Sequence, residues 1–407
     1  MDKLKTAFSK NLKQFVMLFT LVVIIVFFQL MTRGTLLKPM NVFNLINQNA
    51  YVVVLAVGML LCILTGGNVD LSVGSVVAFV GACAGTLMIT WKWDPYLSVF
   101  LCLIMGVLIG AWHGFWIAYV RIPAFIVTLS GQLIFRGLTL IVLKGLTLSP
   151  FPKAFMSLST GAIGNFLGFL DPGSGLRNFT SLLIGIIMGL VFIFLELKKQ
   201  ADRKRKGYSY DSLMVTLVRG LVIAAALVYF FWLLACYIGT PVVLITVGIV
   251  LVVYSYLTSK TVMGRHIYAV GGNEKAARLS GVKTDKIIFL TYVNMSFLAA
   301  VAGLIFSARL QSASPQAGTG FELDAIGAVY IGGASAYGGI GTVGGTLIGA
   351  LIMGVLNNGM SIMGISIDMQ QVVKGLVLLA AVAFDVISKQ KISLPFFTRL
   401  FSRRKAA

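Results

Sequence analysis

The 407-residue sequence predicts an all-α integral membrane protein, a polytopic bundle of about ten transmembrane helices that forms one domain over residues 1–407. Hydrophobic residues make up 58% of the chain, charged residues only 11%, and the mean hydropathy is +0.94. A soluble domain carries about 25% charged residues, so this chain cannot cover a water-exposed surface of its own size with charge. Its basic residues also occur in short clusters between apolar stretches, which is typical of cytoplasmic loops.

Ten apolar stretches supply the predicted spans. About 18 apolar residues suffice to cross the hydrocarbon layer of a bilayer. The stretches lie near residues 14–31, 50–64, 71–90, 97–120, 124–143, 181–197, 220–238, 241–258, 287–307 and 369–387. The first follows four lysines and ends without a small-residue cleavage site, so we expect a membrane anchor and not a signal peptide.

The distribution of Lys and Arg orients these spans. With the N-terminus inside, the inner segments hold 24 basic residues and the outer segments hold 7. An excess of positive charge marks the cytoplasmic side. We therefore expect both termini, the basic loop 198–219 and the loop 259–286 to be cytoplasmic, and the basic loop to contact anionic membrane lipids. The same clustering argues against a nucleic-acid partner despite the net charge of +20.

The region 324–364 is rich in glycine, with twelve glycines between Gly327 and Gly364. Because nine spans precede this region and one follows it, it must cross the membrane an even number of times. A broken or re-entrant hairpin and a pair of short spans both satisfy this condition. Glycines that recur at every fourth position predict close packing of membrane helices. They are Gly106, Gly110 and Gly114 in one stretch, and Gly341, Gly345 and Gly349 in another.

A faint internal repeat relates residues 65–76 to residues 331–343, with one residue inserted in the second copy. Transporters often carry repeats with interrupted segments in matching places. Coincidence between two Gly-rich stretches explains the similarity equally well, so both interpretations stay open.

The sequence contains no motif for catalysis, metal binding or ATP hydrolysis. The patterns G-x-x-x-x-G-K-[ST], H-E-x-x-H, C-x-x-C and G-x-S-x-G are all absent. The G-x-G-x-x-G match at residues 339–344 lacks the strand, turn and helix that a dinucleotide site requires. We therefore expect neither an enzyme nor a cofactor.

Three charged residues fall within or beside the predicted spans, where an ionisable group is a functional candidate. Asp70 and Arg136 qualify, although a helix-end or interhelical polar contact explains them as well. Lys374 lies roughly one turn inside its span, and snorkelling to the interface explains its charge. No carboxylate lies at mid-span, which argues against a carrier coupled to protons or sodium.

The loop 259–286 contains a complete short helix signal. Asn273 is a preferred N-cap residue, Glu274 suits the positive end of a helix dipole, and Gly281 can adopt the left-handed conformation that ends a helix. Because a helix of two turns is not stable alone in water, it must pack against its own spans or against a cytoplasmic partner.

Residues 264–282 of this loop resemble the coupling-loop signature of sugar importer permeases from bacterial ATP-binding-cassette transporters, of the ribose/xylose/arabinose/galactose type. Three further stretches are similar to the same family: residues 67–74, 122–129 with 136–137, and 321–326. The resemblance spans about residues 15–388 and is closest to the multiple-monosaccharide, xylose-like permeases.

The resemblance implies a permease subunit that translocates a monosaccharide of the xylose, arabinose, galactose, glucose or ribose class across the bacterial inner membrane. It also implies a separate cytoplasmic ATPase, an extracytoplasmic sugar-binding protein and a second permease copy, forming a homodimer. The residues expected to couple the permease to the ATPase are Asn273, Glu274, Ala276, Ala277, Arg278 and Gly281. Among them, Ala277 is expected to be small because the helix seats against that partner.

Polar residues in or near the spans are candidates for the translocation path. They are Asn68, Asp70, Arg136, Asn357, Asn358, Gln370 and Gln371. The last four are amides in apolar surroundings, and sugar hydroxyls or water would supply the hydrogen bonds that they need. Hydrogen bonds between helices are the alternative interpretation. An ion-coupled carrier and a membrane-bound transferase are the rival classes, and the scarcity of suitably placed carboxylates disfavours both.

Overall fold

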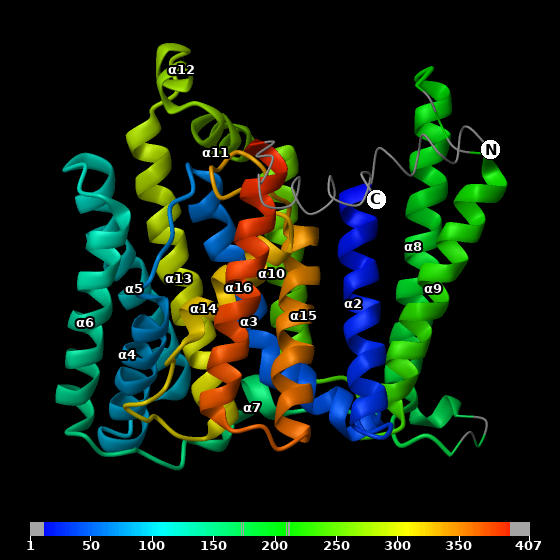
Figure 1. The fold of residues 1–407 in the computed structure, drawn as a ribbon. Coiled ribbons are helices and arrows are strands. Elements are labelled where there is room, and N and C mark those ends of the chain that lie inside the picture. Colours follow the sequence, from blue (N-terminus) through cyan, green and yellow to red (C-terminus); the bar gives the residue numbers. More distant parts are fainter. Residues whose placement is uncertain (1–11, 172, 174, 209, 211, 391–407) are drawn as a thin grey trace, which may run out of the picture.

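The computed structural model describes residues 12–390 except 172, 174, 209 and 211, and there the chain is built of helices joined by loops (Figure 1). Ten of these helices are long and apolar enough to cross a membrane by length and composition. The predicted all-α membrane class is therefore confirmed. The predicted cytoplasmic termini lie largely outside the described residues.

The helix bounds follow the predicted spans with three differences. The α-helices are α2 Leu12–Met31, α3 Pro39–Leu64, α4 Val73–Gly85, α5 Pro95–Gly114, α6 Ala124–Leu143, α7 Lys153–Thr160, α8 Phe179–Arg205, α9 Leu213–Ala235, α10 Val243–Lys260, α11 Val262–Gly272, α12 Glu274–Leu279, α13 Thr284–Leu310, α14 Phe321–Ile331, α15 Val343–Ile362 and α16 Ile367–Gln390. First, α3 begins well before residue 50, and second, α8 continues through the basic residues of the predicted loop. Third, the ten candidate spans include α15, which the sequence did not count as a span. They do not include the first predicted span, because the apolar part of α2, Val16–Met31, is shorter than the others.

Helix α3 forms the centre of the bundle. In its membrane window 83% of the residues are buried, and every residue from Ala50 to Leu64 is buried. Helices α10, α13, α14 and α15 pack around it and bury it on all sides. By contrast, no residue in the window of α16 is buried, so this helix lies at an edge of the bundle.

Five of the six glycines predicted to pack helices closely lie in helices and approach a neighbouring backbone, whereas Gly341 lies in a non-helical segment and faces side chains of Leu60, Ala334 and Leu64. A Cβ atom at Gly110 of α5 would lie 2.5 Å from the carbonyl oxygen of Tyr292 in α13. A Cβ atom at Gly349 of α15 would lie 1.9 Å from the carbonyl oxygen of Ala328 in α14. Side chains at either position would separate the helices, so glycine is required for this packing.

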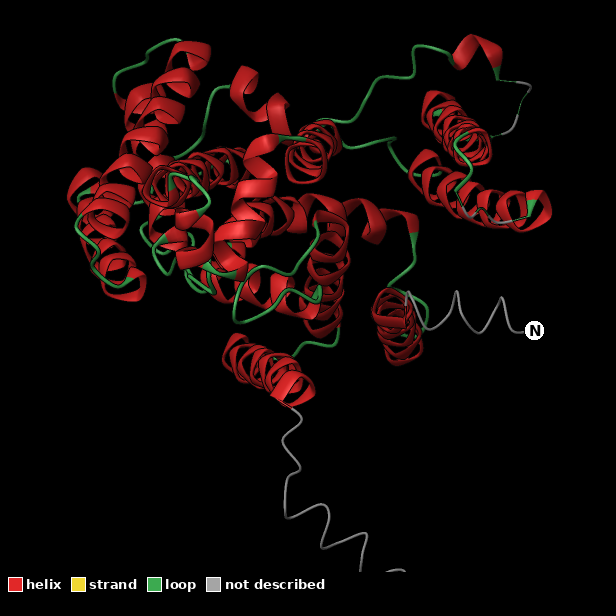
Figure 2. Cartoon of the chain, turned by 90° about the horizontal axis from the view of Figure 1, so that it is seen from above, coloured by secondary structure: helices red, strands yellow, loops and turns green. Residues whose placement is uncertain are grey.

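The α8–α9 hairpin stands to one side of the bundle (Figure 2). Its contact with the bundle includes the start of α3, where Phe43 and Phe231 share a small apolar cluster and the rings of Phe43 and Tyr237 lie 5.5 Å apart. The connection between α8 and α9 lies at the same end of the molecule as α11 and α12 (Figure 1). The two loops that the sequence assigns to the cytoplasm are therefore on one side.

The Gly-rich region forms the short helix α14, a non-helical segment over residues 332–342, and the full-length helix α15. The sequence left open a broken hairpin or two short spans. The observed arrangement combines a helix of 11 residues with one of 20 residues.

Three glycine pairs from separate parts of the chain meet at the end of α3. We call Gly66–Gly67, Gly271–Gly272 and Gly338–Gly339 the glycine junction. The amide of Gly339 donates to the carbonyl oxygen of Leu64 at 3.0 Å. A Cβ atom at Gly67 would lie 2.1 Å from the carbonyl oxygen of Ala336. The two segments of the faint internal repeat therefore pack against each other here.

The junction generates a stability prediction for Gly271. Replacing Gly271 with Ala would put a Cβ atom 1.6 Å from the carbonyl oxygen of Leu64, so the backbones must separate. We expect a loss of about 1–3 kcal/mol in the free energy of unfolding, the usual cost of overpacking. Thermal unfolding of the purified protein in detergent measures it. Gly272→Ala is the matched control, because its Cβ atom would meet nothing within 4 Å. Equal melting temperatures for both variants would contradict the proposed close approach.

Candidate functional site

Helices α11 and α12 project beyond the bundle at one end of the molecule (Figure 1). Helix α12 has six residues, and the side chain of Asn273 accepts a hydrogen bond from the Ala276 amide at 3.0 Å. Gly281, just beyond its end, has φ +86°. The predicted N-cap, short helix and left-handed glycine are all confirmed.

Four charged side chains hold α12 against the bundle, and we call Arg121, Glu274, Arg278 and Asp285 the charge clamp. Arg121, between α5 and α6, donates to Glu274 at 2.8 Å and also to Asp285. Arg278 donates to Glu274 at 3.1 Å and to Asp285 at 3.0 Å. Single exposed ion pairs contribute little, but here two arginines share two carboxylates across three segments of chain. The clamp thus ties α12 to the α5–α6 loop and to the start of α13.

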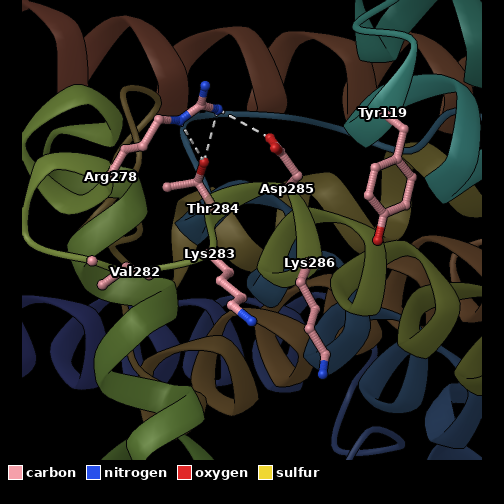
Figure 3. A pocket seen from close by; sticks show the side chains of 8 residues that line it. Tyr119, Arg278, Val282, Lys283, Thr284, Asp285 and Lys286 are labelled. Carbon is pink, nitrogen blue, oxygen red and sulfur yellow. Dashed lines mark hydrogen bonds and ion pairs between the residues drawn. The ribbon is translucent and has the colours of Figure 1, made fainter.

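Arg278 also donates to the hydroxyl of Thr284 at 2.9 Å, as Figure 3 shows. The end of α12, the start of α13 and Tyr119 surround a hollow of about 490 Å³. The side chains of Lys283 and Lys286 line this hollow (Figure 3). The surface beside α12 is therefore concave and basic.

The charge clamp fixes the ionisation of Glu274. Partial burial raises the pKa of Glu274, but the hydrogen bond and charge of Arg121 and the charge of Arg278 outweigh it, so the net pKa is lowered. A lowered carboxyl pKa means that the contact is fully present above the ordinary Glu pKa and is lost as the pH falls through the lowered value. The clamp is therefore intact at neutral pH.

Two apolar residues of α12 differ sharply in exposure. Ala277 is only 6% exposed and belongs to the main hydrophobic core, whereas Leu279 is 91% exposed. The expectation that Ala277 seats against a partner is corrected: its small side chain lies against its own bundle. Leu279 is the apolar side chain that α12 presents outward.

Helix α11 is hydrogen-bonded to the non-helical segment 332–342. The hydroxyl of Tyr268 in α11 donates to the carbonyl oxygen of Gly341 at 2.7 Å. The amide of Ala336 donates to the carboxylate of Asp385 in α16 at 3.1 Å. With the glycine junction, these contacts connect α11 to α3, α15 and α16.

A cavity of about 210 Å³, which we call the polar cavity, lies at the other end of the bundle. It is enclosed by the first part of α3, the last turns of α13 and α15, and the first turns of α16. Its lining residues are Gln48, Asn49, Tyr51, Phe306, Arg309, Asn357, Ser361, Gln370 and Lys374. An amide-rich cavity of this kind is unusual in an apolar bundle.

An ion pair lies at this cavity. Nζ of Lys374 is 2.9 Å from Oδ1 of Asp324, whose side chain is 2% exposed. The hydroxyl of Tyr51 donates to Oδ2 of Asp324 at 3.4 Å. Lys374 therefore turns inward toward α14, and the expectation that it snorkels is corrected.

Only two of the seven path candidates line the polar cavity, namely Asn357 and Gln370. Asn358 is buried and donates to Asn41 at 3.2 Å and to Gln48 at 3.3 Å, which is a contact between helices. Gln371 is exposed and does not line the cavity. Of the four amides, two therefore line the cavity, one bonds between helices, and Gln371 fits neither interpretation.

The other three candidates lie elsewhere and have structural contacts. Asp70 is fully buried and accepts from the amide and the hydroxyl of Ser72, at 2.8 and 2.6 Å. Asn68 lies beside the glycine junction. Arg136 donates to the carbonyl oxygens of Pro315 and Ala317, both at 2.8 Å. These contacts agree with the alternative interpretation of helix-end and interhelical polar groups.

Comparison with known proteins decides the family. Residues 41–382 match the family described as branched-chain amino acid transport system / permease component. The chain belongs to this family of permeases. The permease is 36% identical to the xylose transport system permease protein of Escherichia coli (strain K12) over 383 residues, 94% of each chain. It is 36% identical to the ribose import permease protein of the same strain over 345 residues, 85% of each chain.

A third relative is the ribose import permease protein of Bacillus subtilis (strain 168), 34% identical to the permease over 376 residues, 92% of each chain. No solved structure matches the chain.

Sequence reasoning missed Arg121, Tyr268, Leu279 and Asp285 of the permease. Leu279 carried a signal, because it is the only large apolar residue in this short helix. Arg121 carried a weaker one as the only base in a short loop. Nothing in the sequence pairs Tyr268 with Gly341, which lies 73 residues further along the chain.

The Tyr268 contact gives a prediction about local order. Tyr268→Phe removes the hydrogen bond to Gly341, worth about 0.5–1.5 kcal/mol. We expect peptides that cover residues 332–342 to exchange amide hydrogens about 2–10 times faster, measured by hydrogen–deuterium exchange in lipid nanodiscs. Tyr256→Phe is the control, because Tyr256 is 64% exposed. Unchanged exchange in the Tyr268 variant would show that this contact does not hold the segment.

Proposed function

We propose that this permease is the membrane subunit of an ATP-driven monosaccharide importer, with ATP hydrolysed by a separate cytoplasmic chain. The similarity to xylose and ribose permeases along most of the chain supports the substrate class. The exposed Leu279 on a projecting helix carries the partner proposal. Single exposed apolar side chains are common on protein surfaces, but this one stands on a helix that projects beyond the bundle beside a hollow of about 490 Å³.

The ATPase binds α12 with Leu279 as the apolar anchor. Movement of α12 passes through the charge clamp to the α5–α6 loop and α13. It passes through Tyr268 and the glycine junction to α3 and residues 332–342. The permease itself carries out no covalent chemistry, and transport is alternating access of a path through the bundle.

The proposed orientation places α11, α12 and the basic end of α8 in the cytoplasm of a bacterial cell, with the permease in the inner membrane. The polar cavity then opens toward the side on which an extracytoplasmic sugar-binding protein would deliver its sugar. A second copy of the chain completes the transporter. Helix α16 offers an uncovered apolar face to it, on which Ile367 is 74% and Leu379 66% exposed.

The docking proposal is tested by Leu279→Asp. A charge at this position cannot enter an apolar socket, so we expect co-purification of the ATPase chain to fall at least about tenfold, which corresponds to about 1.4 kcal/mol. Leu279→Met keeps an apolar side chain of similar size and should retain binding. Because Leu279 is 91% exposed, neither change alters the core, and normal yields of both permeases serve as the check. Co-purification of the ATPase chain with the Leu279→Asp variant at the wild-type level would contradict the proposal.

The orientation is tested by cysteine labelling in intact cells, in a background with the four native cysteines replaced. We expect a cysteine at Gln200, near the end of α8, to resist a membrane-impermeant thiol reagent until the cells are opened. A cysteine at Lys92, between α4 and α5 on the opposite side, should react at once. Reaction at position 200 in intact cells would reverse the orientation.

A further inference from the structure

We propose that the polar cavity is a subsite for one neutral monosaccharide on the translocation path. This inference rests on the proposed function and deepens it, because it assigns the residues that hold the sugar and the chemical class that they accept.

The cavity has the size for a single small ring. Its volume of about 210 Å³ is below the about 300–1,000 Å³ of sites for drug-sized ligands. It lies on the side of the bundle opposite α12, where a sugar would enter from outside under the proposed orientation. Helices α3, α13, α15 and α16 each contribute to it, so a change in their relative tilt would open or close the cavity.

Amide side chains dominate its polar lining. Gln48, Asn49, Asn357 and Gln370 each offer both donors and acceptors. The buried Oδ1 atom of Asn357 has no hydrogen-bond partner among the described residues. A sugar hydroxyl is also both a donor and an acceptor, so it can satisfy such groups in either direction.

Arg309 is the second group that lacks a partner. Its guanidinium lines the cavity and is half-buried, and no hydrogen bond or ion pair is found for it within the described part of the chain. Five N–H donors in a planar fork are costly to remove from water without acceptors. Two neighbouring hydroxyl oxygens of a sugar ring present the pair of acceptors that such a fork matches.

Four lining amides against one cation, Arg309, that is unpaired among the described residues favour a neutral polyhydroxyl ring over an anion. The cation of Lys374 is already neutralised by Asp324, 2.9 Å away. The ring of Tyr51 stacks on Phe321 at 4.0 Å and meets the edge of Phe306 at 5.5 Å. Because Tyr51 is only 8% exposed, Phe306, which is partly exposed, is the lining residue that offers apolar surface for the C–H face of a sugar. A carboxylate ligand would also approach the buried charge of Asp324.

The test uses the whole importer in proteoliposomes, with its ATPase and binding protein, and radiolabelled xylose and ribose as probes. Gln370→Ala removes a lining amide, and Gln371→Ala is the matched control because Gln371 is exposed and outside the cavity. We expect the Gln370 variant to move about tenfold less sugar per ATP hydrolysed, the effect of one lost hydrogen bond at the upper end of its range. ATP hydrolysis itself and the Gln371 variant should stay within about twofold of wild type.

Arg309→Gln serves as the second variant, since it retains an amide of similar length and should also reduce sugar moved per ATP while hydrolysis continues. If the wild-type importer transports sugar and both cavity variants transport it equally well, the subsite is wrong and the proposed function stands. A wild-type importer that moves neither sugar with ATP would overturn the proposed function and the subsite together. Preference for xylonate over xylose would overturn the neutral class.

Discussion

The hydrocarbon layer of a membrane offers no hydrogen bonds, so any interruption of a helix must find its partners within the protein. Residues 332–342 of this permease break the helical structure between α14 and α15 beside the end of α3. Their polar groups are met by the carbonyl oxygen of Leu64, the carboxylate of Asp385 and the hydroxyl of Tyr268. Because these partners come from α3, α16 and α11, satisfying one short segment brings together parts of the chain that are far apart in sequence.

This constraint also explains why the coupling segment is attached where it is. Helix α12 is too short to be stable by itself, and the charge clamp gives it a fixed position on the bundle. Helix α11 instead makes backbone-close contact with the glycine junction, where a side chain at Gly271 would collide with the carbonyl oxygen of Leu64. One projecting segment thus has two independent attachments, one electrostatic and exposed, the other dense and buried.

Local features were predictable from the sequence, and contacts between distant residues were not. The span 124–143, the Asn273 cap and the left-handed Gly281 each depend on neighbours within a few residues. The early start of α3 escaped prediction because polar residues such as Asn41 and Gln48 interrupt its apolar pattern. The Arg121–Glu274 contact joins residues 153 positions apart, and only the folded bundle places them together.

The buried pair of Asp324 and Lys374 has a mechanical consequence. Sliding α16 along α14 would pull the two charges apart and leave the carboxylate of Asp324, which is 2% exposed, without its counter-ion. Tilting the two helices together keeps the pair closed and costs nothing of that kind. The ion pair therefore favours joint movement of α14 and α16, so that a shift of the cavity wall formed by α16 is passed on to α14 and to the start of residues 332–342.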